Sequence, residues 1–220
     1  MDDRMVDYYR RRAPEYEAIY HKPERQHDLA ALEVYLQNAF SDLDVLEIAC
    51  GTGYWTQRIA ETARSISASD ISEEVLAIAT AKSYRCPVRF HIEDIYRPGH
   101  SAAALHEALF GGFIWSHIPR QQLTAVIETL AARVCAGGLL VFADNRYVEG
   151  SSTPVRAHDA EGNTWQQRHL DDGSEYLVLK NFPDKSELQT LLSAFGELEV
   201  QELTYFWMVK CRLFSNKMRH

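Results

Sequence analysis

Residues 45–56, VLEIACGTGYWT, combine a short apolar run, two glycines and the beginning of a helical pattern. The apolar run Val45–Ile48 has the length of a buried strand, and residues 54–62 can continue as a helix. Between them, Gly51 and Gly53 have no Cβ, which suits a loop that approaches a ligand closely or adopts a positive φ. The segment therefore predicts a strand, a ligand-binding loop and a helix.

The loop Glu47–Gly53 differs from two familiar phosphate-binding motifs. No Gly-Lys-Ser/Thr triplet follows it, which excludes a P-loop, and it lacks the third glycine of the dinucleotide fingerprint. Acidic residues at the ends of the next two strands favour an adenosyl ligand. Asp70 can accept both ribose hydroxyls, and Asp94 can accept an adenine amino group while the Ile95 amide serves a ring nitrogen.

The neighbouring segments extend the alternation of strands and helices. Residues 29–40 carry a helical stripe, and Ser72 is expected to cap a helix that follows the strand at 66–70. Further strands are expected at 88–92, 109–114 and 139–143, with a helical stripe from Leu123 to Val134 that ends at Gly137 and Gly138. Strands alternating with helices predict a mostly parallel sheet covered on both faces.

The pattern changes after Asp144. Residues 150–163 are polar and rich in turn formers, and the segments 165–170 and 176–180 flank the turn sequence DDGS, which predicts a hairpin. Ser186 and Gln189 have the spacing of a capping box before a short helix, and strands are expected at 198–203 and 206–213. We expect one domain over 1–220, comprising an N-terminal helical lid (1–40), a cofactor-binding core (41–145) and a substrate-side hairpin with the C-terminal strands (146–220).

Bulk properties limit the partners. The formal net charge of -8 opposes a phosphate backbone, and the one dense basic run, Arg10–Arg12, is interleaved with tyrosines as on the polar face of a helix. The four cysteines include no close pair, so no zinc site is expected. No apolar stretch has the length of a membrane span, and the N-terminus lacks the apolar core of a signal peptide. These features predict a cytoplasmic protein that binds neither nucleic acid nor membrane.

The string VLEIACGTGYWT, together with Asp70, the triplet Glu93-Asp94-Ile95 and the strand LLVFADN at 139–145, resembles class I S-adenosylmethionine-dependent methyltransferases over most of the chain. The resemblance implies a Rossmann-like α/β fold with a seven-stranded, mostly parallel sheet, helices on both faces, an N-terminal helical lid and an extra β-hairpin. One departure is Ala49, which stands where the family's G-x-G-x-G motif has its first glycine.

The resemblance also implies a cofactor site for S-adenosylmethionine. Gly51 and Gly53 would lie against the methionine part, Asp70 would hold the ribose, Ile71 would pack on the adenine and Asp94 would bind its amino group. The tyrosines Tyr8 and Tyr16 would close over the cofactor from one face of an N-terminal helix, although ordinary packing residues are the alternative. The full expected set is Glu47, Ala49, Gly51, Gly53, Trp55, Asp70, Ile71, Glu93, Asp94, Ile95, Tyr8, Tyr16 and Phe113.

Three further segments, YYRRRAPEYE at 8–17, FIWSHIP at 113–119 and RHLDDGSEYLVLKNF at 168–182, resemble a bacterial group of small-molecule methyltransferases that includes the phosphonate O-methyltransferase of dehydrophos biosynthesis. Methyl transfer is an in-line displacement in which positioning matters most. The segment 113–119 is therefore expected to border the transferred methyl group.

The candidate acceptor-side residues each have a second interpretation. His117 is expected as catalytic base or substrate ligand, or else as a structural histidine that satisfies loop carbonyls. Trp115 is expected as a pocket wall or as a core aromatic. Arg168 and Lys180, on the two arms of the hairpin, would suit an anionic substrate if they face the pocket, and would otherwise be solvated surface charges.

These observations predict metal-independent O-methylation of a small, acidic metabolite. N-methylation or carboxyl methylation of another metabolite, a peptide or a protein stays open, as does a relative that binds the cofactor without catalysis. A nucleic-acid methyltransferase is disfavoured because the chain is acidic and has no Asn-Pro-Pro-Tyr or Asp-Pro-Pro-Tyr motif after the fourth strand.

Overall fold

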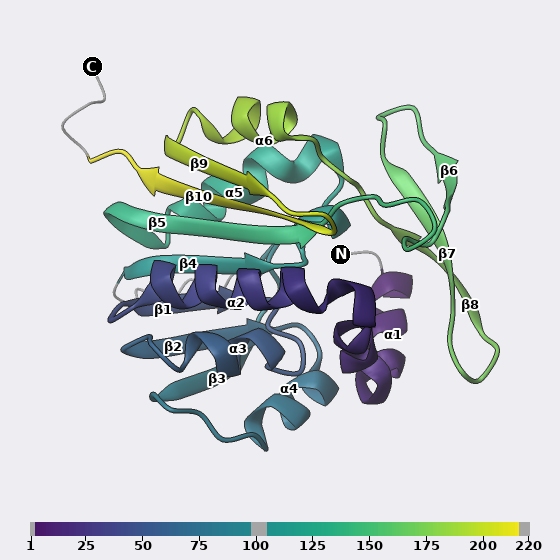
Figure 1. Cartoon of the computed structure of the whole chain (residues 1–220), viewed down its shortest axis with the longest axis horizontal. Coiled ribbons are helices and arrows are strands. Elements are labelled where there is room, and N and C mark those ends of the chain that lie inside the picture. Colours follow the sequence, from purple (N-terminus) through teal and green to yellow (C-terminus); the bar gives the residue numbers. More distant parts are fainter. Residues whose placement is uncertain (1–2, 98–104, 216–220) are drawn as a thin grey trace.

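The computed structural model describes residues 3–97 and 105–215, without the side chains of residues 3–6, 13, 14 and 16. A seven-stranded sheet with the order β3-β2-β1-β4-β5-β10-β9 forms its centre, which confirms the predicted Rossmann-like α/β fold (Figure 1). All pairs from β3 to β5 are parallel, whereas β10 is antiparallel to both neighbours. The strands are β1 (Asp44–Ile48), β2 (Ser65–Asp70), β3 (Val88–Ile92), β4 (His106–Gly112), β5 (Val134–Asn145), β9 (Gly196–Glu202) and β10 (Phe206–Leu213).

Alternating apolar side chains on the strands build a core on each face of this sheet. Val45 on β1 packs in a cluster with residues of α2 (Gln26–Phe40) and α3 (Tyr54–Ile59). The next residue, Leu46, points to the other face and packs in a cluster with residues of α5 (Leu123–Ala131) and α6 (Lys185–Leu192). Both faces are therefore covered, as the apolar strands require.

The loops and helices at the carboxyl ends of β1 and β2 follow the sequence closely. Gly53, with φ +78°, precedes α3, and Ser72 caps α4 (Glu73–Thr80) by accepting a hydrogen bond from the Val75 amide at 3.4 Å. Two 3-10 turns, Trp115–His117 and Arg120–Gln122, follow β4. These loops, helix starts and turns all lie at the carboxyl ends of the parallel strands, which is one end of the sheet.

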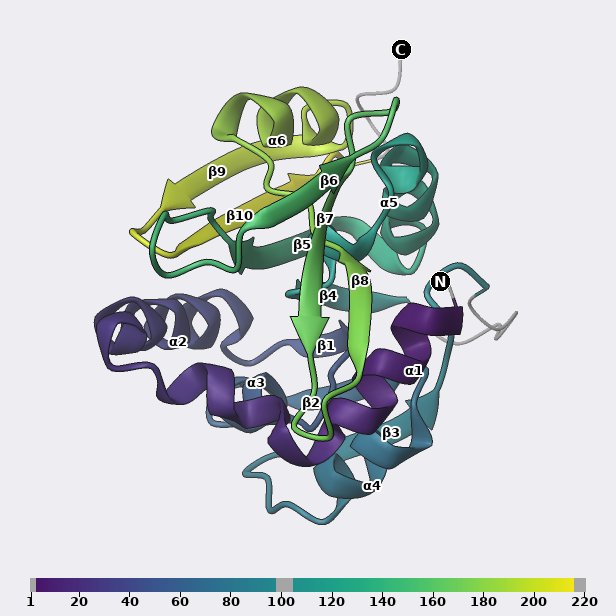
Figure 2. The same cartoon turned by 90° about the vertical axis from the view of Figure 1, so that its right-hand side faces the viewer.

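A separate three-stranded antiparallel sheet stands at that end, beside α1 (Figure 2). Its strands β7 (Thr164–His169) and β8 (Glu175–Leu179) form the expected hairpin. A third strand, β6 (Val155–His158), pairs with β7 and was not predicted because its segment is polar and turn-rich. The expected hairpin is therefore part of a larger element.

The N-terminal segment packs against this small sheet. Helix α1 spans Asp3–Arg12, and 3-10 segments at Ala13–His21 and Pro23–Arg25 lead into α2. Tyr8 is buried in a small cluster with Leu170, Val178 and Leu179 of the small sheet. The prediction that Tyr8 and Tyr16 share one face of a helix is wrong, because the α-helix ends at Arg12 and the following segment has a tighter winding.

Two helix boundaries also differ from the prediction. Asp184, not Ser186, caps α6: its carboxylate accepts from the Glu187 amide at 2.8 Å, and Glu187 accepts from the Asp184 amide at 2.9 Å. The helix therefore begins one half-turn earlier than expected. Helix α5 ends at Ala131, and Val134 already belongs to β5, where a register shift opposite His106 and Ala108 accommodates the glycines of that strand.

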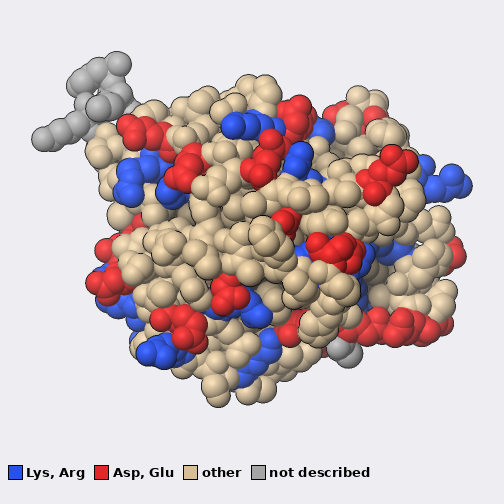
Figure 3. Space-filling view, in the orientation of Figure 1, with Lys and Arg blue, Asp and Glu red and all other residues tan. Residues whose placement is uncertain are grey.

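Acidic and basic side chains are interspersed over the face that carries α2 (Figure 3). Within residues 3–97 and 105–215, no helix has both the length and the apolarity of a bilayer span. The same residues include no cluster of three or more side chains arranged to hold a metal ion.

Candidate active site

A pocket lies at the carboxyl ends of the parallel strands, the usual ligand position in an open α/β sheet. We call it the strand-end pocket; it encloses about 680 Å³ including solvent at its mouth. Each of the strands β1 to β4 supplies part of its wall. Among its lining residues are Ala49 and Gly51 after β1, Asp70 and Ile71 after β2, Glu93, Asp94 and Ile95 after β3, and Phe113, Ile114 and His117 after β4.

Asp70 is tied to the backbone of the glycine loop. Its Oδ2 accepts from the Gly51 amide at 2.9 Å, and its Oδ1 accepts from the Ser72 amide at 3.0 Å. Burial raises the pKa of Asp70 above its ordinary value, although these backbone donors oppose the shift. A carboxylate has about four lone-pair sites, so these two bonds leave acceptor capacity for a pair of ligand hydroxyls.

The two acidic residues after β3, Glu93 and Asp94, have different hydrogen-bond partners. Asp94 Oδ1 accepts from the Tyr96 amide at 3.0 Å, which fixes the carboxylate at the pocket wall. Glu93 Oε2 accepts from Arg133 Nη1 at 2.8 Å, so its charge is compensated within the protein. Asp94 is therefore the member of this pair whose carboxylate is better suited to a ligand donor.

Two non-glycine residues of the strand-end pocket have left-handed backbone. Ala49 has φ +51° and Phe113 has φ +60°, next to Gly51 with φ +56°. Such conformations cost energy for residues with a Cβ and tend to occur at functional sites. Ala49 therefore retains the backbone geometry that a glycine would adopt at the first position of the motif.

Glu47, Gly53 and Trp55 lie around the loop without lining the pocket. Glu47 is 2% exposed, and burial raises its pKa to about 8, so that it is protonated at neutral pH. A Cβ on Gly53 would stand 2.6 Å from Tyr84 Oη, and Trp55 Nε1 donates to Tyr20 Oη at 3.2 Å. These residues pack around the loop Glu47–Gly53 outside the pocket lining.

A second pocket adjoins the first between the core, the N-terminal segment and the small sheet. We call it the cationic pocket, because its lining includes five basic side chains and no Asp or Glu among the described residues. It encloses about 990 Å³ including solvent. The basic residues are Arg12, Lys22, Arg25, Arg168 and Lys180. Tyr9, Phe113 and His117 line both pockets.

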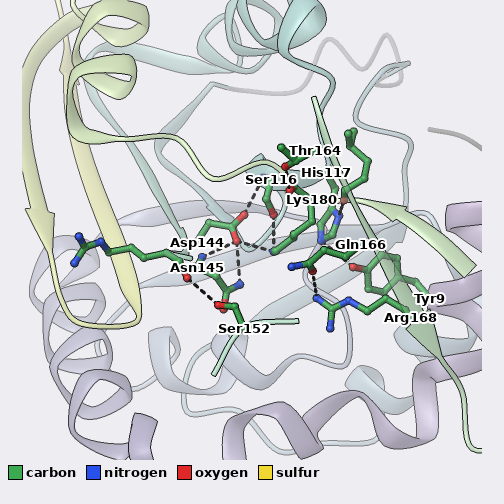
Figure 4. A network of polar contacts seen from close by, with 12 residues as sticks. Tyr9, Ser116, His117, Asp144, Asn145, Ser152, Thr164, Gln166, Arg168 and Lys180 are labelled. Atoms are coloured by element: carbon green, nitrogen blue, oxygen red, sulfur yellow. Dashed lines mark hydrogen bonds and ion pairs between the residues drawn. The ribbon is translucent and has the colours of Figure 1, made fainter. Parts of the chain in front are cut away.

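Lys180 is held in the cationic pocket by two oxygen acceptors (Figure 4). Its Nζ donates to Asp144 Oδ1 at 2.9 Å and to Ser116 Oγ at 2.6 Å. Burial lowers the pKa of Lys180, while the adjacent carboxylate opposes that shift. Burial alone would raise the pKa of Asp144, but the Lys180 ammonium brings it below the ordinary value. The two side chains form a buried ion pair.

Arg168 is positioned by a neighbour on its own strand. Its Nη2 donates to Gln166 Oε1 at 2.5 Å (Figure 4). Gln166 in turn donates to the Thr153 carbonyl. Arg168 and Gln166 both line the cationic pocket. Arg168 and Lys180, which the sequence placed on two arms of a hairpin, are thus brought to one pocket.

His117 stands at the junction of the two pockets and is 6% exposed. Its Nδ1 lies 2.7 Å from the Leu179 carbonyl, which can only accept, so Nδ1 carries the proton. Nε2 then accepts from the Tyr9 hydroxyl at 2.8 Å. Burial, followed by the charge of Lys180, lowers the pKa of His117 to about 3. The imidazole is neutral, and both of its nitrogens are engaged.

Three predicted residues lie elsewhere or are not described. Trp115 packs in the core against Phe142 and Trp207, with ring centroids 5.2 and 5.6 Å apart. Tyr8 packs against Tyr9 and Tyr176. The side chain of Tyr16 lies outside the described residues.

Sequence reasoning missed several residues of the two pockets. Tyr9 adjoins Tyr8, which was considered, but a helix of uncertain orientation gives no means of choosing between them. Asp144 lies one residue before the end of β5, and Asp70 ends β2, so that similar position was a usable signal. Lys22 and Arg25 belong to a polar connection without any motif, so only the folded chain brings them to the site.

Comparisons with known proteins agree with this geometry. A family model described as a methyltransferase domain matches residues 45–138. A malonyl-[acyl-carrier protein] O-methyltransferase of Bacillus cereus is 33% identical over 184 residues, covering 81% of this chain and 64% of that protein. The corresponding protein of Bacillus anthracis is 24% identical over 173 residues, covering 76% and 60%. The chain thus spans about three-fifths of the length of these curated relatives.

Solved structures show similarity over nearly the whole chain. The DhpI-SAM-HEP complex has a TM-score of 0.80 and 29% sequence identity, covering 96% of each chain. The DhpI-SAH complex has a TM-score of 0.78 at the same identity and coverage. The similarity therefore includes the N-terminal segment and the small sheet as well as the core. Together with the strand order and the matched domain, these similarities show that the chain belongs to the class I S-adenosylmethionine-dependent methyltransferases.

Proposed function

We propose that the protein transfers the methyl group of S-adenosylmethionine to an anionic oxygen of a small acidic metabolite. The observation that carries this proposal is the junction of the two pockets at Tyr9, Phe113 and His117. A methyl donor in the strand-end pocket would face an acceptor in the cationic pocket across that junction. The chemistry then needs alignment of donor and acceptor more than it needs acids and bases.

The strand-end pocket has groups suited to each part of the cofactor. Asp70 would accept hydrogen bonds from the ribose hydroxyls, and Asp94 would accept one from the adenine amino group. The backbone at Ala49 and Gly51 allows close approach of the methionine part. When bound, the cofactor supplies an electrophilic methyl group on a sulfonium.

The cationic pocket would hold the acceptor through its acid group. Arg168 and Lys180 would bind the anion and orient one of its oxygens toward the methyl group. An ionised acid has no proton to lose, so these residues would only need to hold one acid oxygen in line with the methyl group, and the bound cofactor would give up that methyl group and leave as a neutral thioether. His117, neutral and engaged at both nitrogens, would position Tyr9 rather than remove a proton.

The named relatives support O-methylation as the reaction type. The Bacillus cereus relative is an O-methyltransferase, and the DhpI structure holds HEP together with SAM. The name of the Bacillus cereus relative places its malonyl group on an acyl-carrier protein, so of these two similarities it is the DhpI complex that supports a small acceptor beside the cofactor.

The direct test is incubation with cofactor labelled in the methyl group and a panel of phosphonates, carboxylates and amines. Label should appear in the acids as methyl esters, identified by mass spectrometry. Arg168→Gln should raise the KM for an acid about tenfold or more, because a charge-assisted bond is worth roughly 1.5–3 kcal/mol. The control variant His169→Gln, with its exposed side chain on the same strand, should not change that KM. Transfer to amines alone would refute the proposal.

A further inference from the structure

The cationic pocket contains a second basic cluster, formed by Lys22 and Arg25, that the proposed mechanism does not use. Arg25 Nη2 donates to Ser151 Oγ at 3.0 Å, and Arg25 Nη1 donates to Asn145 Oδ1 at 3.3 Å. Lys22 Nζ donates to the Ser151 carbonyl at 3.2 Å. Both basic side chains therefore meet at Ser151, on the loop that follows β5.

Every acceptor in this cluster is neutral. Arg25 is 7% exposed, and within the described part of the chain neither it nor Lys22 forms an ion pair with a carboxylate. Its Nε is buried without a hydrogen-bond partner among the described residues. The nearby Glu24 carboxylate accepts from Ser151 Oγ at 3.1 Å instead. A buried guanidinium without a counterion is costly, whereas Lys180 in the same pocket has Asp144.

The two basic clusters occupy different parts of the pocket, on either side of the pair Asp144–Asn145. Lys180 donates to Asp144 Oδ1, and Arg25 donates to Asn145 Oδ1. Asn145 Nδ2 links the two by donating to Asp144 Oδ1 at 3.1 Å. One anionic group at Lys180 and another at Arg25 would therefore be bound side by side rather than at a single point.

Electrostatics connect both clusters. Burial lowers the pKa of Lys22, Arg25 and Lys180, and the charge of Arg168 adds a smaller lowering in all three. Glu24 opposes the shift for Lys22 and Arg25, and Asp144 opposes it for Lys180. Like charges thus accumulate around Arg168 without matching carboxylates in the pocket lining. An incoming ligand with more than one negative charge would relieve this repulsion more than a monoanion would.

We infer that Lys22, Arg25 and Ser151 form a second anion subsite, so that the acceptor is a short metabolite with two acid groups. One acid group receives the methyl group near Lys180, and the other is anchored by Lys22 and Arg25. The inference rests on the proposed function and narrows its substrate class to dicarboxylates and to phosphonates that carry a second acid.

Calorimetric titration of the protein saturated with S-adenosylhomocysteine tests the subsite apart from turnover. The probes are succinate, glutarate and phosphonopropionate, each paired with a monoacid of the same chain length: butyrate, valerate and propylphosphonate. Each two-acid ligand should bind about tenfold tighter or more than its partner, as one added charge-assisted contact predicts. Lys22→Gln should abolish that preference without changing the affinity for S-adenosylhomocysteine. The control Lys185→Gln, exposed on α6, should leave the preference intact.

Arg25→Lys provides a second variant that keeps the charge and loses the planar fork, and it should reduce the preference only partly. Equal binding of paired ligands, or an equal loss of affinity for both on Lys22→Gln, would overturn the subsite. Methylation assays with the same six acids separate the two proposals. Turnover without preference for two acids refutes the subsite alone, whereas tight two-acid binding without methylation of any acid refutes the proposed function.

Discussion

Buried ionisable side chains surround the two pockets, and each has a protonation state set by its immediate neighbours. Glu47 has no cationic partner among the side chains that the structure describes and keeps its proton, whereas Asp144 is ionised beside Lys180. His117 is buried near the Lys180 ammonium and remains neutral. The three environments predict different effects of pH and of substitution on stability and activity.

Glu47→Gln should make the protein less sensitive to pH. The unfolded chain ionises this group near 4.5, but in the fold its pKa is about 8. A raised pKa means that the stability contribution is full below 4.5 and is lost as the pH rises through 8. Between pH 5 and 7 the unfolding free energy of the wild type should fall by about 3 kcal/mol relative to the variant. Urea unfolding of both proteins without cofactor measures this difference, and parallel pH curves would contradict it.

The pair Asp144–Lys180 should show strong energetic coupling. Asp144→Asn leaves a buried ammonium without its counterion, and Lys180→Met leaves a buried carboxylate, so each should cost about 3–5 kcal/mol. The double variant should cost less than the sum of the single variants, because it buries neither charge alone. A double-mutant cycle by urea unfolding gives the coupling energy. Additive single effects would show that the pair does not act as a unit.

The neutral His117 predicts a flat pH profile for the proposed reaction. Its folded pKa of about 3 lies below the ordinary 6.5, so its contribution to stability is present above 6.5 and is lost as the pH falls toward 3. With an acid as acceptor, kcat should show no titration near 6.5 between pH 5.5 and 8, pH values chosen to span the ordinary value. With a carboxylate as acceptor, which stays ionised in this range, a tenfold loss of kcat per pH unit below 6.5 would contradict a histidine that stays neutral there.

At the scale of elements, the carboxyl ends of β1 to β4 position the strand-end pocket. Local sequence predicted this part well, because a glycine loop and strand-end acids such as Asp70 and Asp94 are determined by neighbouring residues. The cationic pocket was predicted only in part. Its residues come from β5, the small sheet and the connection around Lys22 and Arg25, and no local pattern states which of these segments meet.

The N-terminal segment is attached to the cofactor loop through Glu17. Its Oε1 accepts from Thr52 Oγ1 at 2.7 Å and also pairs with Lys82. Glu17→Gln removes the ion pair and should loosen the segment, so trypsin should cleave after Arg10–Arg12 up to about fivefold faster, the effect of roughly 1 kcal/mol. Limited proteolysis followed by mass spectrometry measures the rate.

Glu128→Gln, with its exposed side chain on α5, is the control for this experiment and should cleave at the wild-type rate. Saturation with S-adenosylhomocysteine should slow cleavage in both variants if the segment closes over the cofactor. Identical rates for Glu17→Gln and the wild type would mean that this contact does not hold the segment in place.

For the whole molecule, the net charge and the local charge have opposite signs. The chain carries a formal charge of -8, yet the cationic pocket gathers five basic side chains between the core and the small sheet. Composition therefore argued against a large anionic partner but gave no indication of a small one. The folded arrangement places the positive charge next to the strand-end pocket, where a bound acid could meet a methyl donor.

A crystal structure of the protein with S-adenosylhomocysteine and an acidic acceptor tests the joint use of the two pockets most directly. We predict that the ribose hydroxyls contact Asp70, that the adenine amino group contacts Asp94, and that an acid oxygen faces the sulfur at Phe113 and His117 while Arg168 and Lys180 hold its anionic group. Density for the nucleoside outside the strand-end pocket, or for the acid away from these two basic side chains, would contradict the account.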